Sequence, residues 1–160
     1  MKKHFYLALL AIPIGLLVIF IIARLPSDRI PIDVTDFQAM MEARGLEVVD
    51  AMDLADNERM LVFLSAGTAG FRVEYSKYTS NEGAQYMFNH LRRYGRSRAP
   101  QEVEEVEFNN RNYDFFQISA GGTYWFTLRI DYMVILAIAD VGYGDELQKL
   151  ITEIDETTRN

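Results

Sequence analysis

The sequence contains no cysteine among its 160 residues. This excludes disulfides, thiol nucleophiles, zinc–thiolate sites and a lipid anchor on a cysteine. Histidine is nearly absent as well, because His4 lies in the N-terminal tail and leaves His90 as the one candidate for histidine chemistry. No Ser/His/Asp or Cys/His arrangement can be identified, and this favours a protein that is not an enzyme.

Positive charge is also scarce. Lys2, Lys3 and Arg24 account for three of the 16 basic residues, so beyond Arg24 only 13 basic residues accompany 23 acidic ones, a net charge of −10. A domain this acidic is unsuited to a phosphate backbone, so nucleic acid is not expected as a partner. Hydrophobic residues, in contrast, make up 49% of the chain, which excludes a disordered polymer. The length predicts one domain rather than two.

The segment from Phe5 to Ala23 carries no charge. As a helix, its 19 residues would span about 28 Å, close to the ~30 Å hydrocarbon core of a bilayer. We therefore expect residues 1–24 to form a membrane anchor, with the lipid bilayer as the partner of residues 5–23. The alternative is a cleaved signal peptide, but its apolar region is shorter, ~7–15 residues, and ends in a small-x-small site that Ile21-Ile22-Ala23 does not supply.

Basic residues before the anchor favour a cytoplasmic N-terminus, which places the rest of the chain outside the cytoplasm. We therefore expect a single-pass protein of the cell membrane. Residues 25–34 contain Pro26 and Pro31 and show no helical period, so they are predicted to form a short stalk. Residues 35–157 are then predicted to form a single extracytoplasmic domain.

Helical and strand-like patterns alternate through this domain. Helices are predicted to begin at Thr35, after Thr79 and near Asp145. Strands are predicted at residues 46–49, 60–64, 71–78, 103–108, 113–119, 123–131 and 133–139. Short connections favour antiparallel pairing. We therefore expect an α+β fold, a mostly antiparallel sheet with about three packed helices in the order α-βββ-α-ββββ-α.

Helix ends and the central strand have their own signals. Thr35 and Thr79 each stand three residues before a Gln or Glu, the spacing of a capping box. Gly45 and Gly95 suit the position that follows a helix C-terminus. The run from Met133 to Ala139 is apolar on both faces, which predicts a buried strand in the centre of the sheet.

The strand at residues 123–131 offers a candidate binding face. Its better core row consists of every second residue, Tyr124, Phe126, Leu128 and Ile130. Trp125 and Arg129 then lie on the opposite face, and both residue types are enriched at interface hot spots. This predicts a surface for a membrane-protein partner. The alternative is that a helix covers Trp125, which would make the face ordinary packing.

A basic cluster is a second candidate. Arg92, Arg93, Arg96 and Arg98 can bind a phosphate or carboxylate through planar guanidinium groups, which predicts a sensor of an anionic ligand. The alternative is structural: cations at a helix C-terminus complement its dipole, and the glutamates at residues 102–107 can neutralise them.

An acidic loop is the third candidate. Asp50, Asp53, Asp56 and Glu58 supply oxygen ligands of the kind that Ca²⁺ takes. They support the enzyme alternative, a divalent-cation-dependent hydrolase that uses the loop from Asp50 to Glu58. The D-x-D-x-D-G spacing of an EF-hand loop is missing, which favours a solvated acidic loop. We therefore expect no cofactor, with Ca²⁺ as the alternative.

The layout resembles that of uncharacterised small single-pass envelope proteins of Gram-positive bacteria. The residues that carry the resemblance are the anchor at 5–23, the helix-to-strand run at 37–50 and the strand-to-helix run at 71–91. The resemblance implies an N-terminal anchor, a proline-containing stalk and a compact α+β domain, and it transfers no functional residues. The leading expectation is a membrane-tethered, non-enzymatic interaction or binding domain that serves as an accessory to an envelope complex.

Overall fold

A computed structural model of the chain describes residues 28–55, 58–98 and 104–159. The segment 5–23, for which the sequence predicts a transmembrane helix, lies outside these ranges. No helix in the described part of the chain combines the length and the hydrophobicity that crossing a membrane requires.

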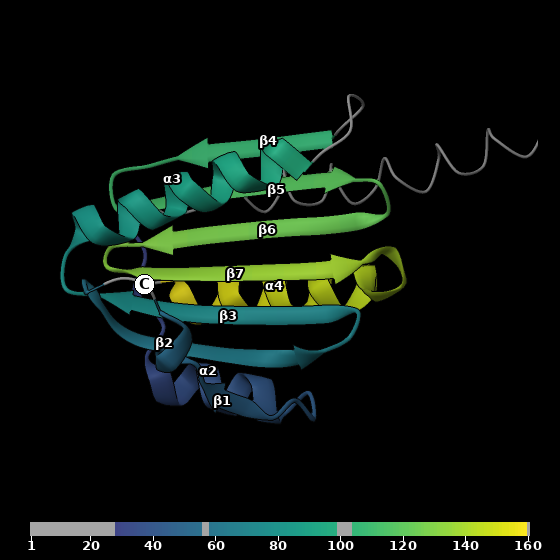
Figure 1. Cartoon of the computed structure of the whole chain (residues 1–160), viewed down its shortest axis with the longest axis horizontal. Coiled ribbons are helices and arrows are strands. Elements are labelled where there is room, and N and C mark those ends of the chain that lie inside the picture. The colour runs from purple at the N-terminus through teal and green to yellow at the C-terminus, as the bar shows by residue number, and fades with distance from the viewer. Residues whose placement is uncertain (1–27, 56–57, 99–103, 160) are drawn as a thin grey trace, which may run out of the picture.

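The described residues form one seven-stranded antiparallel sheet and three α-helices (Figure 1). The strands are β1 (Val48–Asp50), β2 (Met60–Thr68), β3 (Phe71–Tyr78), β4 (Glu104–Asn109), β5 (Tyr113–Ala120), β6 (Thr123–Ile130) and β7 (Met133–Asp140). The helices are α2 (Val34–Glu42), α3 (Asn81–Arg98) and α4 (Gly144–Thr158), with short 3-10 turns η1 (Met52–Leu54) and η2 (Val141–Tyr143). The α+β fold and the predicted order of elements are confirmed.

The sheet consists of two meanders that meet in its centre. Its strand order is β1-β2-β3-β7-β6-β5-β4, so β3 pairs with β7 and the remaining neighbours are consecutive in sequence. Helix α3 connects the end of the first meander to the far edge of the sheet, where β4 lies (Figure 1). The predicted central strand is confirmed, since β7 lies between β3 and β6 and its residues from Met133 to Ala137 are all buried.

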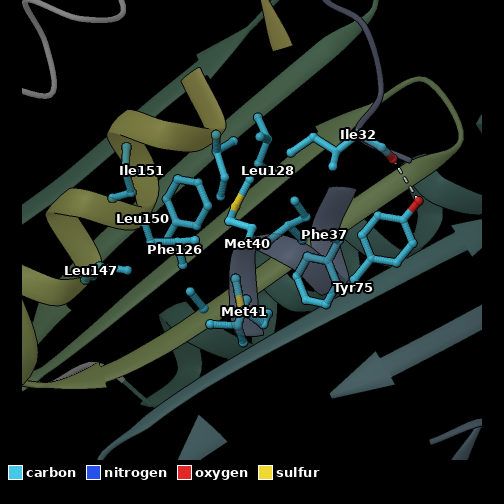
Figure 2. Packing of buried hydrophobic residues seen from close by; sticks show 14 of the residues in the cluster. Ile32, Phe37, Met40, Met41, Tyr75, Phe126, Leu128, Leu147, Leu150 and Ile151 are labelled. Atoms are coloured by element: carbon cyan, nitrogen blue, oxygen red, sulfur yellow. Dashed lines mark hydrogen bonds between the residues drawn. The ribbon is translucent and has the colours of Figure 1, made fainter. Parts of the chain in front are cut away.

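The larger core lies between the sheet and the pair of helices α2 and α4 (Figure 2). Phe126 and Leu128 belong to it, as the alternation in β6 predicted. On the α2 side, the rings of Phe37 and Tyr75 lie 5.0 Å apart, and the Tyr75 hydroxyl donates a hydrogen bond to the Ile32 carbonyl at 2.9 Å. Helices α2 and α4 therefore bury most of this face, and a hollow of about 560 Å³ remains beside Leu46, Phe71 and Tyr143.

Both predicted N-terminal capping residues are wrong, by two positions in α2 and by one position in α3. At α2 the capping group is the Asp33 carboxylate, which accepts from the next backbone N–H at 2.6 Å, rather than Thr35. An aspartate is preferred there because its charge also complements the helix dipole. At α3 the Ser80 hydroxyl accepts from the backbone N–H of Gly83 at 3.2 Å, which displaces Thr79 from the capping role.

The two glycines predicted to follow helix ends behave differently. Gly45 has a φ of +70°, as a residue after a helix C-terminus requires. The prediction for Gly95 is wrong, because α3 continues to Arg98. A Cβ atom at Gly95 would lie 3.2 Å from the Trp125 ring and 3.3 Å from the Phe116 ring. Glycine is therefore needed for close packing of α3 on the sheet.

The described part of the predicted stalk lies against the domain. Arg29 is 5% exposed, forms an ion pair with Asp155 and donates a hydrogen bond to the Thr158 hydroxyl. The Asn112 amide donates to the Arg29 carbonyl at 2.7 Å, and Ile32 is buried in the larger core. Residues 29 and 32 therefore belong to the packed structure.

Candidate ligand-binding groove

Helix α3 covers only part of its face of the sheet. It contacts β5, β6, β7 and the end of β3, and it leaves β2 and most of β3 uncovered on that side (Figure 1). A groove with a volume of about 420 Å³ lies there, and we name it the α3 groove. Its floor includes Phe63, Ser76 and Val134, which the strand register places in one row across β2, β3 and β7.

The wall of the α3 groove comes from α3, whose residues Met87, His90 and Leu91 line it. Met87 and Leu91 are one helical turn apart and share a face. The lining is therefore mostly apolar, and a methionine in it can adapt to the shape of a ligand. Ligand pockets are typically ~300–1,000 Å³, apolar, and furnished with a few polar groups, and the α3 groove fits that description.

The polar groups on the floor come from one strand. Glu74, Ser76 and Tyr78 alternate along β3, so they share the face that α3 partly covers. Ser76 and Tyr78 are 7% and 2% exposed. Burial raises the pKa of the Tyr78 hydroxyl to about 12, and the neighbouring Ser76 side chain offsets part of that rise, although no described residue gives this hydroxyl a hydrogen bond of good geometry. Buried hydroxyls normally have a well-formed hydrogen bond, so the Tyr78 hydroxyl is an exception within this strand.

Among the residues that the structure describes, Glu74 is the one acidic residue of the α3 groove. Burial raises the pKa of its carboxyl above the ordinary value, and the positive charge of Arg72 offsets part of that rise. The Arg72 Nε lies 3.2 Å from Glu74 Oε1, on a side chain that is 54% exposed. A partly desolvated carboxylate in a concave site is a common feature of functional sites.

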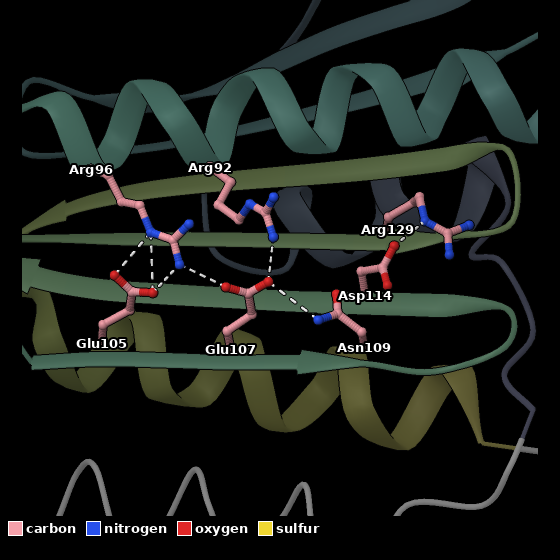
Figure 3. A network of polar contacts seen from close by, with 7 residues as sticks. All are labelled: Arg92, Arg96, Glu105, Glu107, Asn109, Asp114 and Arg129. Carbon is pink, nitrogen blue, oxygen red and sulfur yellow. Dashed lines mark hydrogen bonds and ion pairs between the residues drawn. The ribbon is translucent and has the colours of Figure 1, made fainter.

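The predicted binding face of β6 lies under α3. The Trp125 ring is half-buried and lies 5.5 Å from the ring of Tyr94 on α3. Arg129 is 5% exposed, and its Nε donates to Asp114 Oδ2 at 2.6 Å (Figure 3). Helix α3 therefore lies over Trp125, as the alternative interpretation of this face describes.

Two of the clustered arginines pair with strand β4 (Figure 3). Arg96 Nε donates to Glu105 Oε2 at 3.0 Å, and the same guanidinium reaches Glu107 at 2.7 Å. Arg92 also pairs with Glu107. The glutamates of β4 therefore neutralise Arg92 and Arg96, which is the structural alternative that the sequence offered for this cluster.

The other two arginines of the cluster are exposed near the end of α3. The Arg98 guanidinium donates to the Tyr94 hydroxyl at 2.6 Å and stacks over the same ring. Arg93 faces solvent. An anion site that uses all four arginines together therefore competes with contacts made by three of them.

The acidic loop is described only in part, because Asp56 lies outside the described residues. Asp50, Asp53 and Glu58 are exposed, and the Asp50 carboxylate accepts from the backbone N–H of Met52 at 2.9 Å. Among the residues placed by the structure, no three His, Cys, Asp or Glu side chains come together as a metal site.

The α3 groove was not predicted from the sequence. The alternation of polar Arg72, Glu74 and Ser76 along one side of the third strand was a usable signal, but it indicates only a half-buried strand. Whether a helix covers this side of the strand depends on tertiary packing, and tertiary packing leaves no pattern in the local sequence.

Comparisons with known proteins support the fold alone. The sequence matches no protein-family model, and no curated protein matches it. The structure is similar to the crystal structure of a GTP-binding regulator from Thermotoga maritima, with a TM-score of 0.52 and 13% sequence identity. The alignment covers 84% of this chain and 98% of that one. At this identity the similarity extends to the arrangement of sheet and helices and not to a site.

Proposed function

We propose that this chain is a non-enzymatic binding domain tethered to a membrane, and that the α3 groove is its binding site. The observation that carries the proposal is an apolar groove of about 420 Å³ with Tyr78 in its floor, whose buried hydroxyl has the Ser76 side chain beside it and no hydrogen bond of good geometry. A hydroxyl in that state costs about 1–3 kcal/mol, which a hydrogen bond from a ligand would recover.

The membrane tether rests on the uncharged segment at residues 5–23. Arg29 follows Ala23 by six positions, so at most ~22 Å of chain separates the end of that segment from the folded domain. To test the tether, the full chain and a chain lacking residues 1–24 are expressed in cells, and the membranes are washed with alkaline carbonate. The full chain should stay with the membranes and the shortened chain should not. Release of the full chain would refute the tether.

The groove is tested by thermal unfolding of the full chain in lipid nanodiscs with 2-phenylethanol as the probe. A probe at ten times its Kd should stabilise the protein by about 1.4 kcal/mol, which shifts the melting temperature by roughly 2–6 °C. Met87→Trp, which fills the groove, should abolish the shift, and Arg93→Ala on the solvent side of α3 should keep it. The probe also partitions into the lipid, but it does so equally in the samples of the unmodified, Met87→Trp and Arg93→Ala proteins. Partitioning therefore does not account for a difference between their shifts. An equal shift in the Met87→Trp protein would refute the site.

A second variant tests the observation itself. Tyr78→Phe keeps the ring and removes the hydroxyl, so it should stabilise the free protein by about 1 kcal/mol while weakening the binding of 2-phenylethanol. Urea denaturation and titration with the probe measure the two effects. A loss of stability would mean that the hydroxyl makes a stabilising contact, and the argument for the site would lose its basis.

A further inference from the structure

The charges around the α3 groove indicate a class of ligand. We infer that the groove binds a small apolar ammonium compound, whose charged head pairs with the Glu74 carboxylate and whose apolar body packs between Phe63 of the floor and Met87 of the wall. This inference rests on the proposed function, because it requires the groove to be the binding site.

The first argument is the state of the Glu74 carboxylate. Among the residues that the structure describes, only Arg72 pairs with it, through Oε1 and from a side chain that is more than half exposed. A neutral ligand would remove further water from this carboxylate and supply no compensating partner. An anion would add repulsion between like charges. A cation instead forms a charge-assisted hydrogen bond in a partly desolvated site.

The second argument is the donor pattern. An ammonium group carries three N–H donors and no acceptor, and it matches a site whose polar groups include a carboxylate and a hydroxyl oxygen. Ser76 and Tyr78 on the floor of the groove carry such hydroxyl oxygens, on the same face of β3 as Glu74. The surplus of acidic residues beyond Arg24 adds a long-range attraction for cations.

The third argument is the shape and composition of the lining. The groove holds about 420 Å³, and its lining includes Phe63, Leu91 and Val134. These side chains suit an aryl or branched alkyl body. The ligand class that the groove favours is therefore an ammonium compound with an apolar body.

The test compares two probes of the same shape, 2-phenylethylammonium and 2-phenylethanol, by calorimetric titration of the full chain in nanodiscs of a zwitterionic lipid. The ammonium should bind about tenfold tighter than the alcohol, as expected for a hydrogen bond to a charged group. Glu74→Gln should weaken the binding of the ammonium and abolish the tenfold difference between the two probes.

The outcomes separate this inference from the proposed function. Equal binding of both probes to the wild-type protein, with loss of both in Met87→Trp, would overturn the ammonium preference and leave the groove as a binding site. Binding of neither probe, or binding that Met87→Trp does not reduce, would overturn the proposed function and this inference with it. A tenfold preference that survives Glu74→Gln would overturn the role of Glu74.

Discussion

Arg129 and Asp114 form an ion pair in which both side chains are only 6% exposed. They face each other across β5 and β6 in the strand register, under α3. Removing one member of such a pair leaves the other charge buried without a partner. The pair therefore joins β5 to β6, and its loss should destabilise the folded state.

Arg129→Ala should accordingly lower the free energy of unfolding by roughly 3–5 kcal/mol. Urea denaturation of the full chain measures the change, with Arg93→Ala as a surface control expected to stay within about 0.5 kcal/mol. If Arg129→Ala costs less than about 1 kcal/mol, as exposed pairs do, then the β6 face is accessible and available to a partner.

Glu74 predicts a dependence of stability on pH. Because burial raises the pKa of this carboxyl above 4.5, the folded chain binds its proton more tightly than the unfolded chain does. The stability that the proton contributes is complete below the unfolded pKa and is lost as the pH rises through the raised folded pKa. Glu74→Gln, which stays neutral, should therefore raise the melting temperature near pH 7 and not near pH 3.5. A lower melting temperature near pH 7 would show that the Arg72 pair outweighs the burial.

At the scale of elements, α3 packs closely on the sheet at Gly95. Gly95 lies against Trp125 and Phe116, so any larger side chain there must displace an aromatic ring. Gly95→Leu should destabilise the protein by about 1–3 kcal/mol, as overpacking does. In a Trp125→Ala background the same change should cost clearly less, because the indole no longer occupies the space. Equal costs in the two backgrounds, measured by urea denaturation, would mean that α3 does not pack on Trp125.

Strands were easier to predict than helix ends, for a physical reason. Strands β3 and β7 follow from side-chain alternation and from an apolar run, which depend on residues within the strand itself. A helix cap depends on which of several neighbouring hydroxyls or carboxylates is positioned to accept, and Asp33 and Ser80 compete there with threonines. Gly95 was misassigned because glycine serves both helix ends and close contacts, and Trp125 is 30 positions away in the sequence.

On the scale of the whole molecule, the first described residues and the last helix are joined. Arg29 pairs with Asp155 and bonds to Thr158, and both partners are in α4. The same segment would continue into the predicted membrane anchor, so these contacts would hold the domain close to the bilayer.

Arg29→Ala should lower the free energy of unfolding by roughly 3–5 kcal/mol, because it leaves the Asp155 carboxylate with only Arg159, whose side chain is 43% exposed. Chemical denaturation of the full chain measures it. Arg111→Ala is a matched control on the exposed surface and should change stability by less than about 0.5 kcal/mol. A loss for Arg29→Ala no larger than the control would mean that this segment is not anchored in the domain.

The α3 groove could not be predicted from the sequence because its residues come from five elements, the strands β2, β3 and β7, helix α3 and the η1 turn. Phe63, Ser76, Val134 and Met87 meet only when β3 pairs with β7 and α3 crosses the sheet on its other half. The composition and the periodicity predicted a sheet with packed helices, but they did not predict which part of the sheet α3 leaves uncovered.

The most direct test of the groove uses the methionines, whose methyl groups report separately on the two faces of the sheet. Met60 and Met87 line the α3 groove, whereas Met40, Met41 and Met133 lie in the core on the opposite face. In ¹³C-methyl NMR of the full chain in nanodiscs, 2-phenylethylammonium should shift the first two signals and leave the other three in place. Unchanged Met60 and Met87 signals at saturating probe, or equal shifts on both faces, would contradict the groove as the binding site.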